Sequence, residues 1–247
     1  MASRLCLLLA VLLGLAAPAG ADERPPIVVE LFTSQGCNSC PPADAYLGEL
    51  TRRPGLLPLA FHVDYWNYIG WDDPFARPWS SARQKGYQKS LNERFVYTPQ
   101  IVVNGAAQGI GSERATIEGL LRAAAAAPPR PHPDLTLRRR QDGALIIDIG
   151  AGDSPLGAPA DIWLVGFDRM HHTQVLRGEN EGQTLTDYHT VRFYRRIGAW
   201  PGWSLELVVP ASDTAALGTG AVAVLIQTAW LGPILTASLL ESGESSR

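Results

Sequence analysis

Cysteine is scarce in this sequence. Only three cysteines occur among 247 residues, and Cys6 lies in an apolar run near the N-terminus, so Cys37 and Cys40 form the one pair in the rest of the chain. An excess of either charge is also missing, because the formal net charge is -3. This near-neutral balance gives no signal for nucleic acid as a partner.

A basic residue followed by an apolar run opens the chain. Arg4 precedes the apolar residues 5–17, and small residues follow at positions 19–21. This pattern is typical of a secretory signal peptide at residues 1–21, with an uncleaved membrane anchor as the alternative. We therefore expect a periplasmic or secreted protein that begins near Asp22. In such an oxidising compartment a lone cysteine pair persists as a disulfide, as a pair of metal ligands or as a redox couple.

A clear membrane-spanning helix is not evident in the remainder of the sequence. Residues 221–240 are apolar and about long enough to cross a bilayer, but a Gly-Pro pair interrupts them and Gln227 and Thr228 lie among them. The valines at the start of this stretch favour a strand. We predict two buried strands joined at residues 231–233, and hence no stable membrane span after signal cleavage. A membrane helix is the alternative.

The first part of the chain, residues 22–127, alternates strand and helix signals. Apolar runs predict strands, an Asn-Gly pair predicts a tight hairpin turn, and Ser or Pro residues mark helix starts. Strands are expected at 27–32, 57–65, 100–103 and 106–109. Helices are expected at 41–50, from Ser80 or Ser81 to Leu91, at 113–126 after Ser112, and as a short helix from Asp73-Pro74. The predicted order is β-α-β-α-β-β-α, that of an α/β domain.

The second part of the chain has a different pattern. Residues 128–133 are rich in proline and predict a stiff linker. Short strand signals separated by Gly, Pro and Asp turns then predict an all-β sandwich-like domain at residues 134–240. Its strands are expected at 135–140, 144–149, 161–167, 191–196, 204–209 and in the apolar pair described above. Residues 241–247 are expected to form a disordered tail.

The two cysteines form a C-x-x-C motif between the first strand and the first helix. A helix N-terminus favours the reactive thiolate, and the two-residue spacing lets Cys40 reach Cys37 to form, pass on or resolve a disulfide. Thr98-Pro99, just before the third strand, is a second element of interest. A cis Pro99 would leave the backbone of Thr98 free to pair with an extended substrate, whereas a trans Pro99 would open an edge strand.

These motifs and their order resemble the thioredoxin fold. More closely, several stretches resemble a family of secreted bacterial thioredoxin-like proteins of unknown function: residues 30–37, 40–44, 62–66, 97–100, 177–180 and 184–185. The resemblance implies a thioredoxin-like domain at residues 22–127, with Cys37 as the attacking cysteine, Cys40 as the resolving one and Pro99 as the cis proline. It implies no substrate, because that family is itself uncharacterised.

One departure from the thioredoxin pattern concerns the start of the first helix. Pro41 and Pro42 directly follow Cys40, where thioredoxins continue a helix already begun. We therefore expect the helix to begin late, with Cys40 near its cap. Cys37 is favoured as the nucleophile because we expect it to be the more exposed of the two.

Other side chains near these motifs allow two interpretations each. Glu30 interrupts an apolar strand and is expected either to shuttle protons for the thiols or to form a salt bridge. Asp64 ends the second strand, where it either belongs to a ligand site or caps the loop that follows. Tyr65 and Trp66 belong to an aromatic cluster that forms either a substrate groove or a local core under a long loop. The other members of this cluster are Tyr68, Trp71, Phe75 and Trp79.

Histidines and a polar stretch in the second part also invite interpretation. Histidine and methionine suit Cu(I) together with thiolates, although loop histidines are often simply solvated. The residues concerned are His62, Met170, His171, His172 and His189. Arg177, Glu179 and Asn180 either line the domain interface or make a hydrogen-bonded turn, and we favour the turn.

The sequence therefore predicts a thiol–disulfide oxidoreductase that acts on a protein or small thiol or disulfide substrate, without a cofactor or a resident metal. Its site would consist of Glu30, Cys37, Cys40, Thr98 and Pro99, with substrate contacts from Asp64, Tyr65 and Trp66. Two alternatives use the same cysteines: a copper-binding carrier, and a non-catalytic binding module in which C-x-x-C is a structural disulfide.

Overall fold

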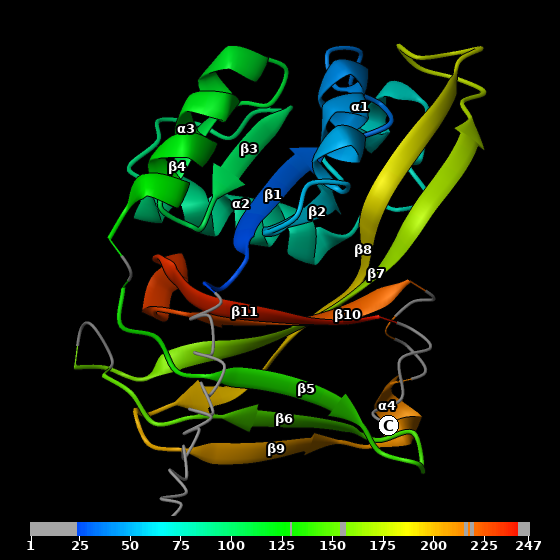
Figure 1. The fold of residues 1–247 in the computed structure, drawn as a ribbon. Coiled ribbons are helices and arrows are strands. Elements are labelled where there is room, and N and C mark those ends of the chain that lie inside the picture. The colour runs from blue at the N-terminus through cyan, green and yellow to red at the C-terminus, as the bar shows by residue number, and fades with distance from the viewer. Residues whose placement is uncertain (1–23, 129, 154–156, 215–216, 218–219, 242–247) are drawn as a thin grey trace, which may run out of the picture.

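The chain has a mixed α/β structure with one sheet of eight strands and a separate sheet of three (Figure 1). The computed structural model describes residues 24–128, 130–153, 157–214, 217 and 220–241. The expected signal peptide and residues 242–247 of the expected tail lie outside these ranges. Glu241, predicted to open the tail, is instead the last residue of a strand.

The elements of the first part follow the predicted order. They are β1 (Ile27–Thr33), α1 (Pro41–Leu50), β2 (Leu56–His62), α2 (Pro78–Ser90), β3 (Gln100–Val103), β4 (Ala107–Ile110) and α3 (Arg114–Ala126). The second part contributes β5 (Leu135–Arg139), β6 (Leu145–Ile149), β7 (Ala160–Gln174), β8 (Thr184–Trp200), β9 (Leu205–Val209), α4 (Ala211–Thr214), β10 (Ala221–Gln227) and β11 (Ile234–Glu241). Short 3₁₀ turns occur at η1 (Asn67–Ile69) and η2 (Ala229–Leu231).

Local turn and cap predictions had mixed success. The Asn104-Gly105 hairpin turn is confirmed, since both residues have positive φ. No helix starts at Asp73-Pro74; the short helical turn lies earlier, at η1. The predicted serine caps are wrong. Pro78 and Arg114 open their helices, and no side chain caps either one.

The large sheet has the strand order β11-β10-β7-β8-β2-β1-β3-β4. Strand β1 is parallel to β2 and antiparallel to β3, which is antiparallel to β4. Because side chains alternate along a strand, Val28 and Phe32 pack toward α2, whereas Val29 and Leu31 pack toward α1 and α3. Burial of both faces explains the continuous apolar run that predicted this strand.

Strands β7 and β8, 15 and 17 residues long, carry the sheet from the second part into the first. They run up beside α1 in Figure 1, and β8 meets β2 through the pair Ala60 and Thr190. Helix α1 lies directly on β8, because a Cβ on Gly48 would be 2.4 Å from the Tyr188 ring. The two predicted units thus share one sheet. The predicted boundaries at the proline-rich linker stay a prediction.

The three-stranded sheet, with order β5-β6-β9, packs against the lower part of the large sheet. Leu145 and Ile147 on β6 share an apolar cluster with Ile162 on β7, Trp200 on β8 and Val224 on β10. Burial between two sheets explains why β10 and β11 are so apolar, and it confirms the prediction of two strands for that stretch. Within the described part of the chain, no helix is long and apolar enough to cross a membrane.

Candidate functional site

Cys37 and Cys40 form a disulfide at the N-terminus of α1. Their Cα atoms are 5.4 Å apart. Cys40 is the N-cap residue, and the N–H groups of Ala43 and Asp44 donate to its carbonyl. The helix therefore begins at Pro41, as the proline pair predicts. The helix dipole favours negative charge at this end, which is the charge of a thiolate, whereas Pro41 and Pro42 offer it no N–H group.

The peptide bond between Thr98 and Pro99 is cis and lies beside the first turn of α1. A Cβ on Gly111 would be 3.1 Å from Ala43 and 3.3 Å from the Cβ of Pro99, so Pro99 and the first turn of α1 flank the same glycine. Trp66 Nε1 donates to Thr98 Oγ1 at 2.8 Å. The fold thus brings Thr98, Pro99 and Trp66 to the end of the sheet that carries the disulfide.

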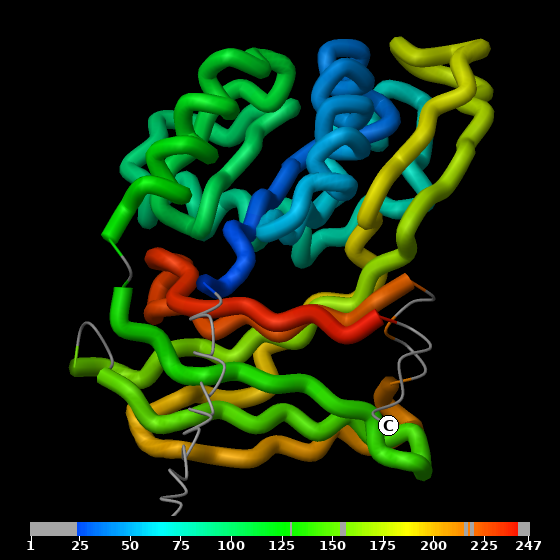
Figure 2. The backbone as a smooth tube through the Cα atoms, viewed as in Figure 1, coloured from blue at the N-terminus to red at the C-terminus, as the bar shows by residue number. Residues whose placement is uncertain are grey.

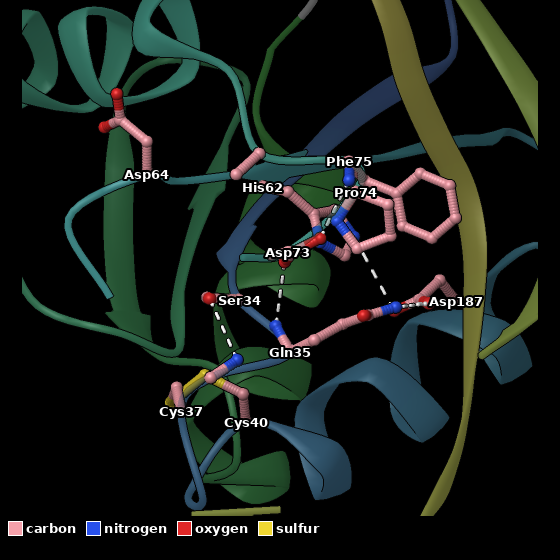
Figure 3. A network of polar contacts seen from close by, with 12 residues as sticks. Ser34, Gln35, Cys37, Cys40, His62, Asp64, Asp73, Pro74, Phe75 and Asp187 are labelled. Carbon is pink, nitrogen blue, oxygen red and sulfur yellow. Dashed lines mark hydrogen bonds and ion pairs between the residues drawn. A yellow bond between two sulfur atoms is a disulfide. The ribbon is translucent and has the colours of Figure 1, made fainter. Parts of the chain in front are cut away.

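The residues beside Trp66 point in different directions. A Cβ on Gly36 would be 3.1 Å from the Cβ of Trp66, so Trp66 packs on the loop that precedes Cys37. The Tyr65 hydroxyl instead donates to Gln84 on α2 at 3.0 Å. Ser81 Oγ accepts from the backbone N–H of Asp64 and donates to its carboxylate. Asp64 points away from the disulfide in Figure 3, so the capping interpretation of this residue is favoured over a ligand site.

The tip of the β7–β8 hairpin, residues 175–183, covers the disulfide loop. Asn180 is buried, and its Nδ2 donates to the carbonyls of Gln35 at 2.9 Å and Cys37 at 3.0 Å. The N–H of Asn38 donates to the Glu179 carboxylate at 3.3 Å. Figure 2 shows this tip at the same end of the molecule as the start of α1. The stretch is a turn, as predicted, and it also holds the cysteine loop in place.

Both cysteines are 0% exposed. The expectation that Cys37 is more exposed than Cys40 is therefore wrong for this conformation. The physical reason is the hairpin tip, which the sequence places about 140 residues away and which gave no sign of returning to the cysteines. Asn38 and Ser39, between the two cysteines, remain exposed.

A buried polar cluster of Gln35, His62, Asp73 and Asp187 lies behind the disulfide loop (Figure 3). The backbone N–H of Gln35 donates to Asp73 at 2.9 Å, and its side-chain Nε2 donates to Asp187 at 2.7 Å. His62 Nδ1 lies 2.7 Å from the same Asp73 oxygen. Two separate chain segments, at Asp73 and Asp187, are therefore tied directly to the residue two positions before Cys37, and His62 is tied to it through Asp73.

Burial and the charges within this cluster shift the pKa values of its side chains. Burial alone would lower the pKa of His62, but Asp73, which is both charged and hydrogen-bonded to it, and Asp187 outweigh burial and raise the pKa to about 9. Burial would raise the pKa of Asp73, but His62 and two backbone N–H groups hold it below its usual value. Burial raises the pKa of Asp187. At neutral pH the cluster therefore contains an imidazolium paired with the Asp73 carboxylate.

Glu30 does not belong to this site. It lies on the face of β1 that packs toward α2, because it alternates with Leu31, which faces α1. Arg83 Nε donates to Glu30 Oε1 at 2.6 Å, and the Tyr87 hydroxyl donates to Oε2. The salt-bridge interpretation is therefore favoured, and the proton-shuttle interpretation has no contact to support it.

The histidines and the methionine of the second part are spread out. His171 Nε2 lies 2.9 Å from the Asp168 carboxylate, His172 bonds Thr186, and His189 bonds the Pro58 carbonyl. Met170 is exposed. Among the residues that the structure describes, no group of three or more His, Cys, Asp or Glu side chains could hold a metal ion.

Several residues of this site were not predicted from sequence. Gln35, Asp44 and His62 stand inside stretches that carried the family resemblance, so the stretches were found but the roles were not. Asn180 was interpreted as a turn residue, with the domain interface as the alternative, and its bonds to Gln35 and Cys37 were not predicted. Asp187 had no local signal, because only the pairing of β7 with β8 and of β8 with β2 brings it to His62.

The fold and the site together define a class: mixed α/β proteins with a C-x-x-C disulfide at a helix start, covered by a long hairpin. Within that class, the chain belongs to the family described as protein of unknown function (DUF1223), whose model matches residues 28–227. The predicted membership of an uncharacterised family is thereby confirmed.

One solved structure extends this comparison. A crystal structure of a protein from Agrobacterium tumefaciens is similar to this chain with a TM-score of 0.77 and 34% sequence identity, over 92% of this chain and 99% of that chain. No curated protein matches the chain.

Proposed function

We propose that the protein is a periplasmic or secreted thiol–disulfide oxidoreductase that uses the Cys37–Cys40 couple. The observation that carries this proposal is the disulfide at the N-terminus of α1, with the cis Thr98–Pro99 bond beside the first turn of that helix. A helix N-terminus stabilises the thiolate that attacks a disulfide or leaves one. The backbone of Thr98 would pair with an extended substrate.

We also propose that the first part of the chain is a thioredoxin-like unit. The order of its elements supports this, as do the parallel pairing of β1 with β2 and the antiparallel hairpin of β3 and β4 on the other side of β1. The second part would then contribute β7 and β8 as an added edge and cover.

Cys37 is proposed as the nucleophile and Cys40 as the resolving cysteine. Ser39 Oγ lies 3.3 Å from Cys37 Sγ, where a hydroxyl can donate to a thiolate. The exposed Asn38 adjoins Cys37, and the N-cap position of Cys40 keeps it against the helix. In the reduced protein, Cys37 attacks a substrate disulfide, releases one substrate thiol and forms a mixed disulfide. Cys40 then attacks Cys37, releases the second substrate thiol and forms the Cys37–Cys40 disulfide.

Burial of both sulfurs means that a substrate reaches them only after the hairpin tip moves away. Among the described residues, three hydrogen bonds join the tip to the cysteine loop, two from Asn180 and one to Glu179, and Gly178 also lies close to Trp71. A neutral hydrogen bond contributes about 1 kcal/mol net, so the free energy needed to open the tip is small compared with that of global unfolding. The substrate would be an extended protein segment or a small thiol or disulfide.

The decisive experiment combines catalysis with trapping. Cys37→Ser is expected to abolish insulin reduction and oxidative refolding activity, whereas Cys40→Ser is expected to accumulate a mixed disulfide at Cys37 that mass spectrometry detects. Wild-type activity in Cys37→Ser would refute the proposal.

One observation favours a second candidate function. The complete burial of both cysteines under Asn180 also suits a binding module in which the bond is a structural crosslink. Such a bond resists reduction by glutathione, so the reduction potential separates the two candidates.

A further inference from the structure

Helix α1 covers the buried polar cluster at the end of the sheet that carries the disulfide. Thr33 on β1 and His62 on β2 are register partners, so their side chains lie on the same face, the one that α1 covers. Asp187 enters from β8, with Oδ1 3.6 Å from His62 Nε2. That distance is too long for a hydrogen bond, and among the described residues His62 Nε2 has no hydrogen-bond partner. A buried polar atom of this kind needs an explanation.

Asp44 on α1 approaches this buried polar cluster from the helix side. Its N–H donates to the Cys40 carbonyl at 3.1 Å, so Asp44 lies one helical turn after Cys40 on the same face of α1. Both side chains are buried. Burial raises the pKa of Asp44 to about 8, the charges of Asp187 and Asp73 add to the rise, and His62 opposes it. The Asp44 carboxyl therefore carries a proton at neutral pH.

A buried cysteine pair needs such a group. When the disulfide is reduced, Cys40 leaves as a thiolate, and a buried thiolate is unfavourable unless it gains a proton or a charge partner. Both sulfurs are 0% exposed when the hairpin tip is closed, so once the tip closes again over the reduced pair, bulk water no longer exchanges protons with Cys40 directly. Asp44 holds a proton one turn away on the helix that carries Cys40.

We propose that Asp44 exchanges a proton with Cys40 in each redox cycle, and that His62, Asp73 and Asp187 position it for this exchange. The inference rests on the proposed function and names a residue that completes it. No other side chain is assigned this role, and Glu30 is excluded because it lies on the opposite face of β1.

The step balances with a dithiol as the reductant. A substrate thiolate attacks Cys37, the S–S bond breaks, and Cys40 keeps the electron pair as a thiolate. Asp44 gives its proton to Cys40, and its carboxylate then lies near the His62 imidazolium. The second substrate thiol displaces Cys37, which takes the proton that this thiol loses. The dithiol is oxidised to a disulfide, and the protein pair is reduced to two thiols.

Site-resolved carbon NMR of labelled cysteine in the fully reduced protein tests the exchange. In the wild type, the Cys40 resonance should titrate in two coupled steps, one of them Asp44. In Asp44→Asn it should titrate in a single step, with an acid dissociation constant at least about tenfold larger, because the Asp44 carboxylate no longer opposes the thiolate. The matched control is Glu49→Gln, an exposed carboxylate on the same helix, which should reproduce the wild-type curve.

A second variant keeps the test decisive if Asp44→Asn does not fold. His62→Gln removes the imidazolium that favours the Asp44 carboxylate, so both coupled steps should move to higher pH. A Cys40 titration in Asp44→Asn that matches the wild type, or one in His62→Gln that does not move, overturns the role of Asp44. Failure of the proposed function looks different: the wild type exchanges no disulfides, while Cys40 and Asp44 still titrate together.

Discussion

Glu30 and Arg83 form an ion pair in which both side chains are fully buried. The sequence could show that a carboxylate interrupts an apolar strand, but not which face it occupies, because its partner lies 53 residues away on α2. Alternation along β1 settles the question once the helices are placed: Glu30 faces α2, and the disulfide helix lies on the other side. The residue is therefore part of the packing between helix and sheet.

Replacing Glu30 by Gln leaves the Arg83 guanidinium buried without its charge partner. We expect the free energy of unfolding to fall by about 3–5 kcal/mol, measured by urea denaturation. Glu49→Gln removes an exposed partner of Arg114 and should change stability little. A Glu30→Gln protein with full stability that no longer exchanges disulfides would instead support the proton-shuttle interpretation.

His62 makes stability depend on pH. Because folding raises its pKa from 6.5 to about 9, the native state holds a proton that the unfolded chain releases. The stabilisation is complete below about pH 6.5 and is lost as the pH rises through about 9; a shift of this size corresponds to on the order of 3 kcal/mol. The free energy of unfolding should fall over that window in the wild type and less steeply in His62→Gln. An exposed control, His172→Gln, should follow the wild type. If the free energy of unfolding falls equally with pH in all three proteins, His62 is not protonated in the native state.

At the scale of elements, the β7–β8 hairpin is the feature that sequence patterns described least well. Strands were expected at 161–167 and 191–196, whereas β7 and β8 continue to Gln174 and back to Thr184. The added residues at the ends of these two strands are polar and lack apolar alternation. They form strands because the two segments pair with each other beside α1. Central strands such as β1 were predicted because burial on both faces leaves a sequence signal.

Asn180 at the hairpin tip should control access to the disulfide. Asn180→Ala removes two hydrogen bonds, to the carbonyls of Gln35 and Cys37. At about 1 kcal/mol each, the open state should gain roughly 10- to 30-fold in population, and reduction by dithiothreitol should accelerate by the same factor. Gln174→Ala, an exposed position on the same hairpin, should react at the wild-type rate. Identical rates in both variants would mean that the tip does not limit access.

At the scale of the whole molecule, one common sheet and the hydrogen bonds of Arg83 join the two parts. Arg83 bonds Glu30 in the first part and Tyr194 and Gln227 in the second, and β8 meets β2 in one sheet. A linker rich in proline predicted separate units, but sequence composition carries no information on which strands will pair across it. The consequence is that neither part completes its core without the other.

Unfolding should therefore be a single cooperative transition. We expect tryptophan fluorescence and far-ultraviolet circular dichroism to report the same urea midpoint, because tryptophans lie in both parts, for example Trp79 and Trp200. Two separated transitions would instead indicate that the parts fold independently, as the linker suggested.

The reduction potential of the Cys37–Cys40 pair, measured by equilibration with glutathione buffers, tests the central claim most directly. A redox couple should have a potential above about -300 mV, among catalytic pairs that lie between about -270 and -120 mV. A potential below about -300 mV would show that the bond is a structural crosslink and would contradict the proposed oxidoreductase function.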